Sequence, residues 1–354
     1  MKHFLWVTIF AGFIIFNCSS SKIQPPNDDY DVQLPGIPGQ RGSEGFAEAD
    51  GLIGVKPKSP YQEFYLLDSI RVVVDDPYET EGIFDSPRML ILYALPNGNS
   101  IEWTMGKRKN EIDDWHFNIQ YIDAQTKWLR QNTRERYTVA YLEAPHLSWP
   151  AWKRSHPNYG EMIAQVLDSL RSIYPQARVI LNSHRGGGSF VNGFIKSQAQ
   201  IPGWIKRIGF IDSNYGYDAE IGVKIETWLN SDPNNHLAVF AYNDSIALYE
   251  GKPFVSATGG TWYRSKMMIK DLGQKRRLAK TDAHEGIIQY RSDDEQILIL
   301  LKENPSRGIF HTEQVELNGF IHSLLFGSAF ENAGYEYFGE RCYEEYILLD
   351  TPPF

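Results

Sequence analysis

Short apolar runs alternate with amphipathic stretches along the chain from about residue 60 onward. The apolar runs are nearly continuous, which is typical of strands buried on both faces of a parallel sheet. They cover residues 70–74, 89–94, 137–142, 177–181, 205–211, 237–241 and 296–301. Stretches at residues 115–130, 159–173 and 313–326 repeat their apolar positions about every 3.6 residues and predict helices. The alternation predicts an α/β fold with a mostly parallel, doubly wound sheet.

Polar clusters follow the predicted strands at their carboxyl ends. They include Asn97-Gly98, the run from Ser183 to Gly188, Asp212, and Asn243-Asp244. Ligands of open α/β sheets bind outside the carboxyl ends of the strands. We therefore expect the functional site at this edge of the sheet.

The segment between the last two predicted strands, about residues 245–294, is too long for a plain crossover. It contains Gly259-Gly260-Thr261-Trp262-Tyr263-Arg264. We expect it to form an inserted helical lid over the sheet edge.

The first residues resemble a bacterial lipoprotein signal. Lys2 precedes an apolar run from Phe4 to Phe16, which suits the central region of a signal peptide and is short for a membrane span. Cys18 follows in a loose lipobox and is the expected lipidation site. The alternative is an ordinary cleaved signal with an incidental cysteine. On the lipoprotein reading, residues 1–18 are signal, 19–50 a Pro- and Gly-rich tether, and 51–354 one domain.

Composition narrows the functional class only slightly. The 354 residues are 42% hydrophobic and 14% aromatic, too apolar for a disordered chain. The net charge of −9 argues against nucleic acid as a partner. The histidines are scattered singly, and only Cys342 accompanies Cys18, so we expect no metal site, and nothing in the sequence calls for a cofactor.

The run Ser183-His184-Arg185-Gly186-Gly187-Gly188-Ser189 lies between a predicted strand and a helix. A strand, a sharp turn of small residues and a helix make up the nucleophile elbow, G-x-S-x-G. With Asp244 after the penultimate strand and His311 after the last, residues 60–340 resemble the α/β-hydrolase superfamily. The elbow is most similar to that of extracytoplasmic esterases, which have G-H-S-G-G there. The resemblance implies an α/β-hydrolase fold and a carbohydrate esterase-like activity at the cell envelope.

The apex of the elbow departs from this pattern, because Arg185 stands where the nucleophilic serine belongs. A guanidinium stays protonated and cannot attack. Ser183 or Ser189 replaces the nucleophile in one interpretation, although Ser183 would have Leu181 and Arg185 at positions that require small residues. In a second, Arg185 clamps an anion in a non-catalytic site. In a third, the chemistry has changed, either to β-elimination from a uronate or to water activated by His311 and an aspartate. An engineered replacement of the serine is disfavoured because such changes usually introduce alanine.

The resemblance implies roles for other residues. His311 is the expected base, and Asp244 its orienting acid, with Asp212 one strand earlier as the alternative. Asn97, Gly98 and Gly186 are the candidate oxyanion residues. Further residues lie in the loops expected around this site, and several have aromatic rings that can stack on sugars. These candidate substrate contacts are His184, His116, Trp262, Tyr263 and Arg264.

Two functions remain open from the sequence. One is a lipid-anchored carbohydrate esterase-like hydrolase, periplasmic or on the outer membrane, with a carbohydrate or acidic glycan as its substrate. The other is a non-catalytic protein of the same fold that binds a glycan or another anion through Arg185.

Overall fold

The computed structural model describes residues 61–67, 69–77, 88–109, 119–133, 135–347 and 353. The signal segment with Cys18, the tether and His116 lie outside these residues. No helix in the described part of the chain is long and apolar enough to cross a membrane.

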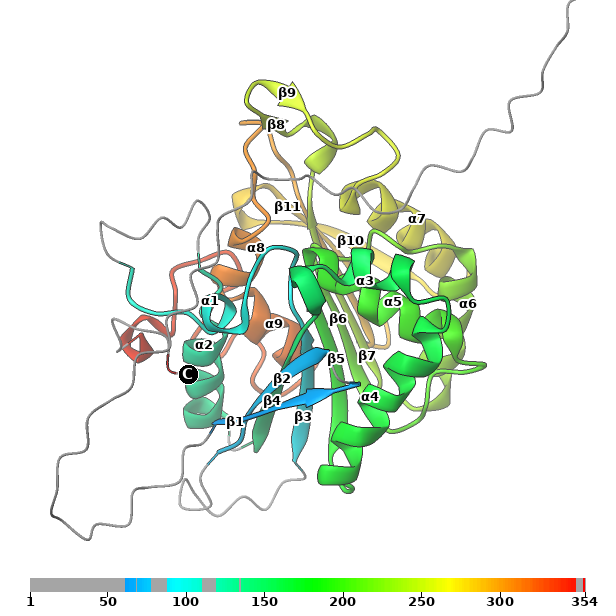
Figure 1. The fold of residues 1–354 in the computed structure, drawn as a ribbon. Helices are drawn as coiled ribbons and strands as arrows, with labels where there is room; N and C mark the ends of the chain where they lie inside the picture. The colour runs from blue at the N-terminus through cyan, green and yellow to red at the C-terminus, as the bar shows by residue number, and fades with distance from the viewer. Residues whose placement is uncertain are drawn as a thin grey trace, which may run out of the picture.

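A ten-stranded sheet forms the centre of the molecule (Figure 1). Its strands in chain order are β1 (Tyr61–Leu66), β2 (Ile70–Asp75), β3 (Met89–Ala94), β4 (Tyr137–Glu143), β5 (Arg178–His184), β6 (Ile205–Ile211), β7 (His236–Tyr242), β10 (Leu278–Ala283), β11 (Ile287–Ser292) and β12 (Ile297–Lys302). In space their order is β1-β2-β4-β3-β5-β6-β7-β12-β11-β10.

The central strands run parallel and the outer ones do not. In the spatial order β4-β3-β5-β6-β7-β12, each strand pairs in parallel with the next. At one side β2 pairs antiparallel with β4 and β1, and at the other β11 pairs antiparallel with β12 and β10. The succession β1-β2-β4-β3-β5-β6-β7-β12 with β2 reversed is that of the α/β-hydrolase fold, which confirms the predicted fold class.

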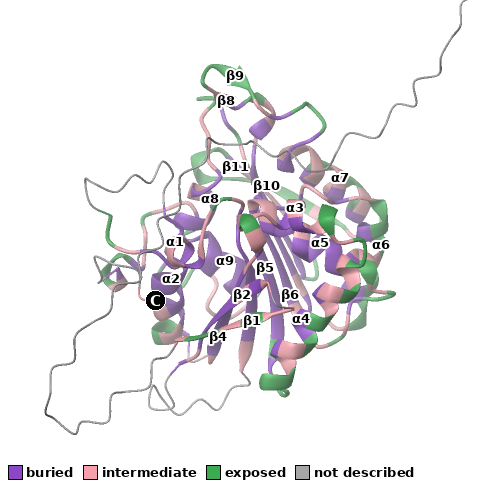
Figure 2. Ribbon diagram, in the orientation of Figure 1, coloured by how far each residue is buried: buried purple, intermediate pink, exposed green. Residues whose placement is uncertain are grey.

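Helices cover both faces of the sheet. One face carries α3 (Trp149–Ser155), α4 (Tyr159–Ile173), α5 (Gly188–Ser197), α6 (Ala219–Ser231) and α7 (Thr261–Gly273); the other carries α1 (Ile101–Met105), α2 (Ile122–Asn132), α8 (Glu313–Glu316) and α9 (Gly319–Leu325). Each face of the sheet has its own hydrophobic core, the first under α3 to α7 and the second under α1, α2, α8 and α9. Successive side chains of a strand point to opposite faces, so Leu92 lies in the first core and Tyr93 in the second. The inner strands are buried along most of their length, whereas β1 and β10 at the two sides of the sheet are largely exposed (Figure 2).

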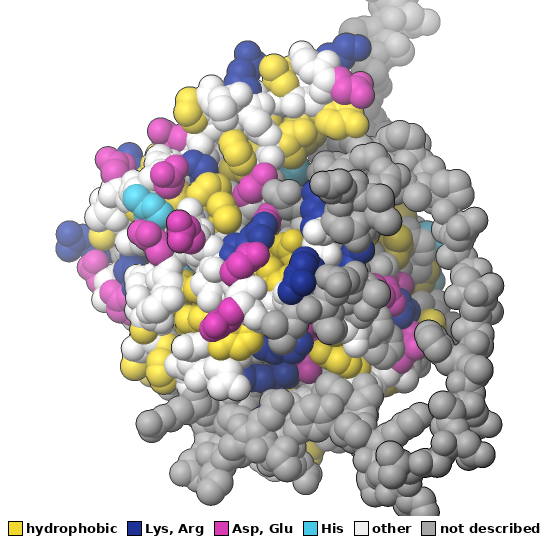
Figure 3. All heavy atoms as spheres, turned by 90° about the vertical axis from the view of Figure 1, so that its left-hand side faces the viewer, with side chains coloured by type: hydrophobic (Ala, Val, Ile, Leu, Met, Phe, Trp, Pro, Cys, Tyr) yellow, Lys and Arg dark blue, Asp and Glu magenta, His cyan; other side chains and the backbone are white. Residues whose placement is uncertain are grey.

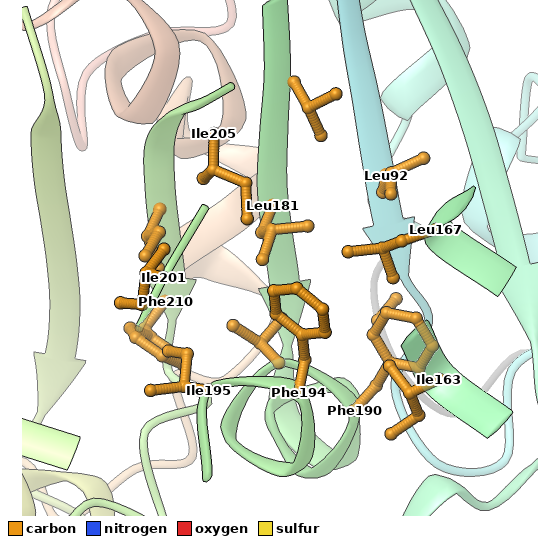
Figure 4. Close-up of a cluster of buried hydrophobic side chains, with 14 of the residues drawn as sticks. Leu92, Ile163, Leu167, Leu181, Phe190, Phe194, Ile195, Ile201, Ile205 and Phe210 are labelled. Atoms are coloured by element: carbon orange, nitrogen blue, oxygen red, sulfur yellow. The ribbon is translucent and has the colours of Figure 1, made fainter. Parts of the chain in front are cut away.

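Part of the first core lies between the middle strands and the helices α4 and α5. Phe190 and Phe194 of α5 pack with Ile163 of α4 against Leu92 and Leu181 of the strands (Figure 4). In α4 the buried positions are Ile163, Val166, Leu167 and Leu170, the spacing of one helix face. This packing fixes α5 behind the end of β5.

The segment 245–294 differs from the predicted helical lid. Its one α-helix, α7, buries Met268 and Leu272 in the first core, and only short 3-10 turns accompany it. The following residues form β10 and β11, which extend the sheet. Only the short hairpin of β8 (Leu248–Tyr249) and β9 (Lys252–Pro253) projects beyond the sheet edge (Figure 1).

One face of the molecule carries charged side chains of both signs. On the face drawn in Figure 3, Lys and Arg side chains are interspersed with Asp and Glu among the described residues. Several charged side chains of the molecule form ion pairs, for example Arg71 with Glu63 and Glu102. The surface charge is therefore mixed on this face.

Candidate functional site

A sharp turn joins β5 to α5 and places Arg185 at its apex. Arg185 has φ of 44°, in the left-handed region that a non-glycine residue adopts only at a cost. The glycines after it allow close backbone approach: a Cβ at Gly187 would lie 2.0 Å from the carbonyl oxygen of Ala94, and one at Gly188 1.6 Å from that of Ser213. The local structure is thus a strand, a sharp turn and a helix packed closely together, with Arg185 at the apex of the turn.

The Arg185 guanidinium has no hydrogen bond or ion pair with any residue that the structure describes. The side chain is half-buried. Its charge lowers the pKa of both His184 and His311, after the larger effect of burial. A cation therefore lies near the imidazoles with its hydrogen-bonding fork unused.

His311 is paired with Asp212, which the sequence offered only as the alternative acid. Nδ1 of His311 contacts Oδ2 of Asp212, and the two side chains are almost completely buried. Asp212 directly follows β6 and has φ of 47°, so a strained backbone aims its carboxylate. The assignment of Asp244 as the partner of His311 is corrected by this contact.

The charge state of His311 follows from its surroundings. Burial and the nearby Arg185 cation hold the pKa of His311 well below its usual range, so the imidazole is neutral at pH 7. Burial raises the pKa of Asp212, while the Thr261 hydroxyl and Arg185 oppose that rise. With Nδ1–H donated to Asp212, Nε2 is an acceptor, and the Tyr242 hydroxyl donates to it at 3.2 Å.

Asp244 holds the start of α7. Its Oδ2 accepts a hydrogen bond from the Thr261 backbone N–H at 2.8 Å. The Thr261 hydroxyl also bonds Oδ1 of Asp212, so the two buried carboxylates are linked through one side chain. Burial and the negative charge of Asp212 raise the pKa of Asp244 to about 7. Asp244 thus reaches His311 only through Thr261 and Asp212.

Two predicted residues lie beneath the elbow. Ser183 is 0% exposed, and its hydroxyl hydrogen-bonds that of Ser213 at 2.8 Å. His184 is 1% exposed, and its Nε2 bonds the backbone carbonyl of His311 at 3.0 Å. Ser183 is therefore inaccessible as a nucleophile, and the ring of His184 is bonded to the backbone at His311 beneath the elbow.

The oxyanion candidates divide in the same way. The Gly98 N–H already donates to the Leu147 carbonyl at 2.9 Å and is not available. The Asn97 side chain lies against Gly186, where a Cβ would meet Oδ1 at 2.0 Å. Oδ1 of Asn97 is buried with no partner among the described residues. Gly186 stands before α5, where backbone N–H groups lack intrahelical partners, so Asn97 and Gly186 remain candidates.

The predicted substrate contacts of the 245–294 segment lie in the first turn of α7. The Trp262 ring is half-buried with Lys266 Nζ 4.9 Å above its centre. Arg264 Nη1 donates to the Tyr217 carbonyl at 3.0 Å, and Tyr263 is half-exposed. None of these contacts tests a substrate role.

Sequence reasoning missed three residues of this cluster: Tyr242, Tyr215 and Thr261. Tyr242 is the last residue of β7, one residue beyond the strand expected from the sequence, and had no expected role. Tyr215 follows Asp212-Ser213-Asn214; burial raises its pKa well above the usual value, and the negative charges of Asp212 and Asp244 raise it further. A polar residue after Gly259-Gly260 was the available signal for Thr261. No group of three or more His, Cys, Asp or Glu side chains in the described structure is arranged to hold a metal.

Comparison with known proteins gives only distant structural similarity. No family model matches the sequence, and no curated protein is significantly similar to it. A thermostable esterase is similar over 72% of this chain and 58% of its own, at 13% identity and a TM-score of 0.43. The siderophore hydrolase EstB from Aspergillus nidulans matches over 78% of this chain and 97% of its own, at 12% identity and a TM-score of 0.40.

A further match is the poly(3-hydroxybutyrate) depolymerase LpqC from Bordetella parapertussis. It covers 71% of this chain and 83% of its own, at 12% identity and a TM-score of 0.38. The alignment with the first of these proteins spans little more than half of its length. Likeness this weak carries no argument about activity or substrate, which must come from the site itself.

Proposed function

We propose that the protein is a hydrolase that cleaves an ester of an acidic carbohydrate, with water as the nucleophile. The observation that carries this proposal is the neutral His311, held by Asp212, beside an Arg185 without a partner among the described residues. A neutral imidazole oriented by a carboxylate is a general base. An unpaired guanidinium is a docking point for a carboxylate or phosphate.

In the proposed reaction His311 Nε2 takes a proton from water as the water oxygen attacks the ester carbonyl. The negative charge on the carbonyl oxygen is stabilised by the Gly186 N–H, by the start of α5 and by Arg185. Collapse breaks the bond to the alcohol oxygen, which receives the proton from His311, and leaves the acid. The Tyr242 hydroxyl bonds Nε2 at 3.2 Å, so proton transfer requires that bond to be exchanged for one to water.

The proposed substrate follows from charge and from rings. Arg185 favours a substrate with a carboxylate or phosphate next to the scissile ester, as in an O-acetylated uronate or in a methyl ester whose neighbouring uronate is free. Trp262 and Tyr263 supply half-buried rings for a sugar face. The expected lipid on Cys18 would hold the enzyme at the cell envelope, in the periplasm or on the outer membrane, where such glycans occur.

The second candidate is a non-catalytic binding protein for an acidic glycan. Two observations favour it: Arg185 stands at the elbow apex, and the Nε2 lone pair of His311 is already satisfied by the buried Tyr242 hydroxyl. In this case Arg185 binds the anion and His311 only supports the fold.

The two candidates are separated by a turnover assay on acetylated and methyl-esterified uronate oligosaccharides. We expect Asp212→Asn to lower turnover by about 10³- to 10⁴-fold, since the imidazole loses its orienting carboxylate. Asp244→Asn is the matched control, because it also changes a buried aspartate bonded to Thr261, and it should cost less than about tenfold. Circular dichroism checks that both variants fold.

Three outcomes decide the matter. Labelling of the wild type by a fluorophosphonate would reveal a reactive serine and overturn attack by water. No turnover, together with acidic-oligosaccharide binding that Arg185→Ala abolishes in calorimetry, would select the binding protein. Arg185→Ser should become reactive to the fluorophosphonate, because His311 and Asp212 are already aligned behind the elbow.

A further inference from the structure

The two carboxylate oxygens of Asp212 have different hydrogen-bond partners in the described structure. Oδ2 contacts Nδ1 of His311, and Oδ1 accepts a hydrogen bond from the Thr261 hydroxyl. Asp212 and Thr261 are both 0% exposed. A buried carboxylate oxygen without a donor is costly, so the Thr261 hydroxyl stabilises the orientation in which Asp212 faces His311.

Thr261 is itself held by Asp244. Oδ2 of Asp244 accepts a hydrogen bond from the Thr261 backbone N–H at 2.8 Å and lies 3.3 Å from Thr261 Oγ1. A hydroxyl has one proton to donate, and Asp212 lies nearer to it than Asp244 does. One aspartate therefore fixes the backbone of Thr261, while its hydroxyl is donated to the other.

The helix that begins with Thr261 fixes the hydroxyl in space. A Cβ at Gly260 would lie 2.2 Å from each carboxylate oxygen of Asp244, so the close approach of Asp244 to the start of α7 requires a glycine there. Met268 and Leu272 of the same helix are buried in the first core. The Thr261 hydroxyl thus belongs to an anchored element and cannot follow Asp212 if that carboxylate turns away from His311.

We infer that Thr261 is a positioning residue, whose hydroxyl holds the Asp212 carboxylate in the orientation that aligns His311. The inference rests on the proposed function, in which His311 is the base and Asp212 orients it. Thr261 acts on the reaction only through Asp212. The aspartate–histidine pair is in this way extended to a connected set of four buried side chains, His311, Asp212, Thr261 and Asp244.

The same hydroxyl favours the charged form of Asp212. Burial raises the pKa of Asp212, and the Thr261 hydroxyl and the Arg185 cation oppose that rise. The titratable and charged groups around this carboxylate are His311, Arg185, Asp244, Tyr215 and Tyr242. Loss of the Thr261 hydroxyl should therefore raise the pKa of Asp212, and turnover, which needs the carboxylate, should begin at higher pH.

The test compares Thr261→Val with Thr261→Ser in the full chain. Valine keeps the shape and the backbone N–H but lacks the hydroxyl, whereas serine keeps the hydroxyl and lacks only the methyl group. On acetylated and methyl-esterified uronate oligosaccharides, Thr261→Val should lower kcat by about 10- to 100-fold with KM unchanged. It should also move the acidic limb of the pH profile to higher pH, and Thr261→Ser should restore most of the turnover.

Thr126→Val is the matched control. Thr126 is also 0% exposed, and its hydroxyl bonds the Ile122 carbonyl at 2.7 Å within α2. This variant loses a buried hydroxyl that does not contact Asp212, so kcat should be unchanged. If Thr261→Val does not fold, Thr261→Cys takes its place, because a thiol is only a weak donor.

A second measurement does not depend on turnover. In NMR with isotope-labelled histidine, the His311 Nδ1–H proton is assigned by its loss in His311→Gln. It should exchange with water at least about tenfold faster in Thr261→Val than in the wild type and in Thr261→Ser, because the bond to Asp212 is then less well held.

The outcomes separate this inference from the proposed function. The inference is overturned if Thr261→Val leaves the exchange of Nδ1–H unchanged, or if Thr261→Ser is impaired as much as Thr261→Val, which would assign only packing to Thr261. Absence of turnover in the wild type would refute the proposed hydrolase, and the exchange rates would still decide the role of Thr261. Faster exchange with an unchanged kcat would support the positioning role and refute His311 as the base.

Discussion

Replacing Gly188 by alanine is expected to destabilise the elbow strongly. A Cβ at this position would lie 1.6 Å from the Ser213 carbonyl oxygen, whereas a carbon and an oxygen need about 3.3 Å. The two backbones must therefore separate by roughly 1.7 Å. Ser213 follows Asp212 directly, and its hydroxyl bonds Ser183 O at 3.0 Å and Ser183 Oγ at 2.8 Å.

The magnitude follows from these contacts. Overpacking a tight site costs about 1–3 kcal/mol, and each weakened buried hydrogen bond about 1 kcal/mol more. We therefore expect the free energy of unfolding to fall by about 3–5 kcal/mol. With a urea dependence of about 3 kcal/mol per molar, the midpoint would fall by more than about 1 M.

Urea unfolding followed by circular dichroism measures this change. Gly203→Ala is the matched control, because a Cβ there meets nothing within 4 Å. It should shift the free energy of unfolding by less than about 1 kcal/mol. Equal midpoints for Gly188→Ala and Gly203→Ala would refute the close packing of the elbow against the end of β6.

Three further predictions concern charges and rings elsewhere. Arg276→Met should lower the free energy of unfolding by about 3 kcal/mol in urea, because the side chain is 8% exposed and bonds Glu226. Arg277→Met is the control, because that side chain is 80% exposed, and it should lower the free energy by less than about 0.5 kcal/mol. Equal losses would contradict the buried Arg276–Glu226 ion pair. The pKa of His322 is about 4 in the folded protein and about 6.5 in the unfolded chain, so between these values the unfolded chain binds one more proton and stability falls as the pH drops. His322→Phe should therefore reduce the slope of the unfolding free energy against pH by up to about 1.4 kcal/mol per pH unit. An unchanged slope would exclude a neutral, buried His322. Tyr242→Phe removes the hydroxyl that bonds Nε2 of His311. Because that hydroxyl occupies the place of the attacking water, the variant should raise turnover while leaving the urea midpoint within about 1 M. Lower turnover would show that Tyr242 assists His311.

The inner strands were predictable because strands buried on both faces consist almost entirely of apolar residues. The apolar runs at 89–94 and 205–211 coincide with β3 and β6. The predicted helix at 313–326 is interrupted, because Asn318 has φ of 64° and separates α8 from α9. Apolar periodicity continues across that break, so the pattern alone did not reveal it.

The location of the candidate site could be predicted from the sequence, but which aspartate pairs with His311 could not. The elbow, His311 and the sheet edge follow from the order of elements. Asp212 and Asp244 end neighbouring strands, and the choice between them depends on backbone angles and on Thr261, which bonds both. The insertion was misjudged because β10 is largely exposed, and an exposed edge strand lacks the apolar signature of a buried one.

The antiparallel strands at both sides of the sheet have a consequence for amide hydrogen exchange. In the sheet that the described residues form, β4, β3, β5, β6, β7 and β12 each pair with a strand on both sides, while β1 and β10 are the outermost strands. Edge amides exchange through local opening, but those of β5 and β6 are released only when the sheet comes apart. The strands that carry Arg185 and Asp212 therefore belong to the slowest-exchanging part of the molecule, and the elbow keeps its strained backbone as long as the protein stays folded.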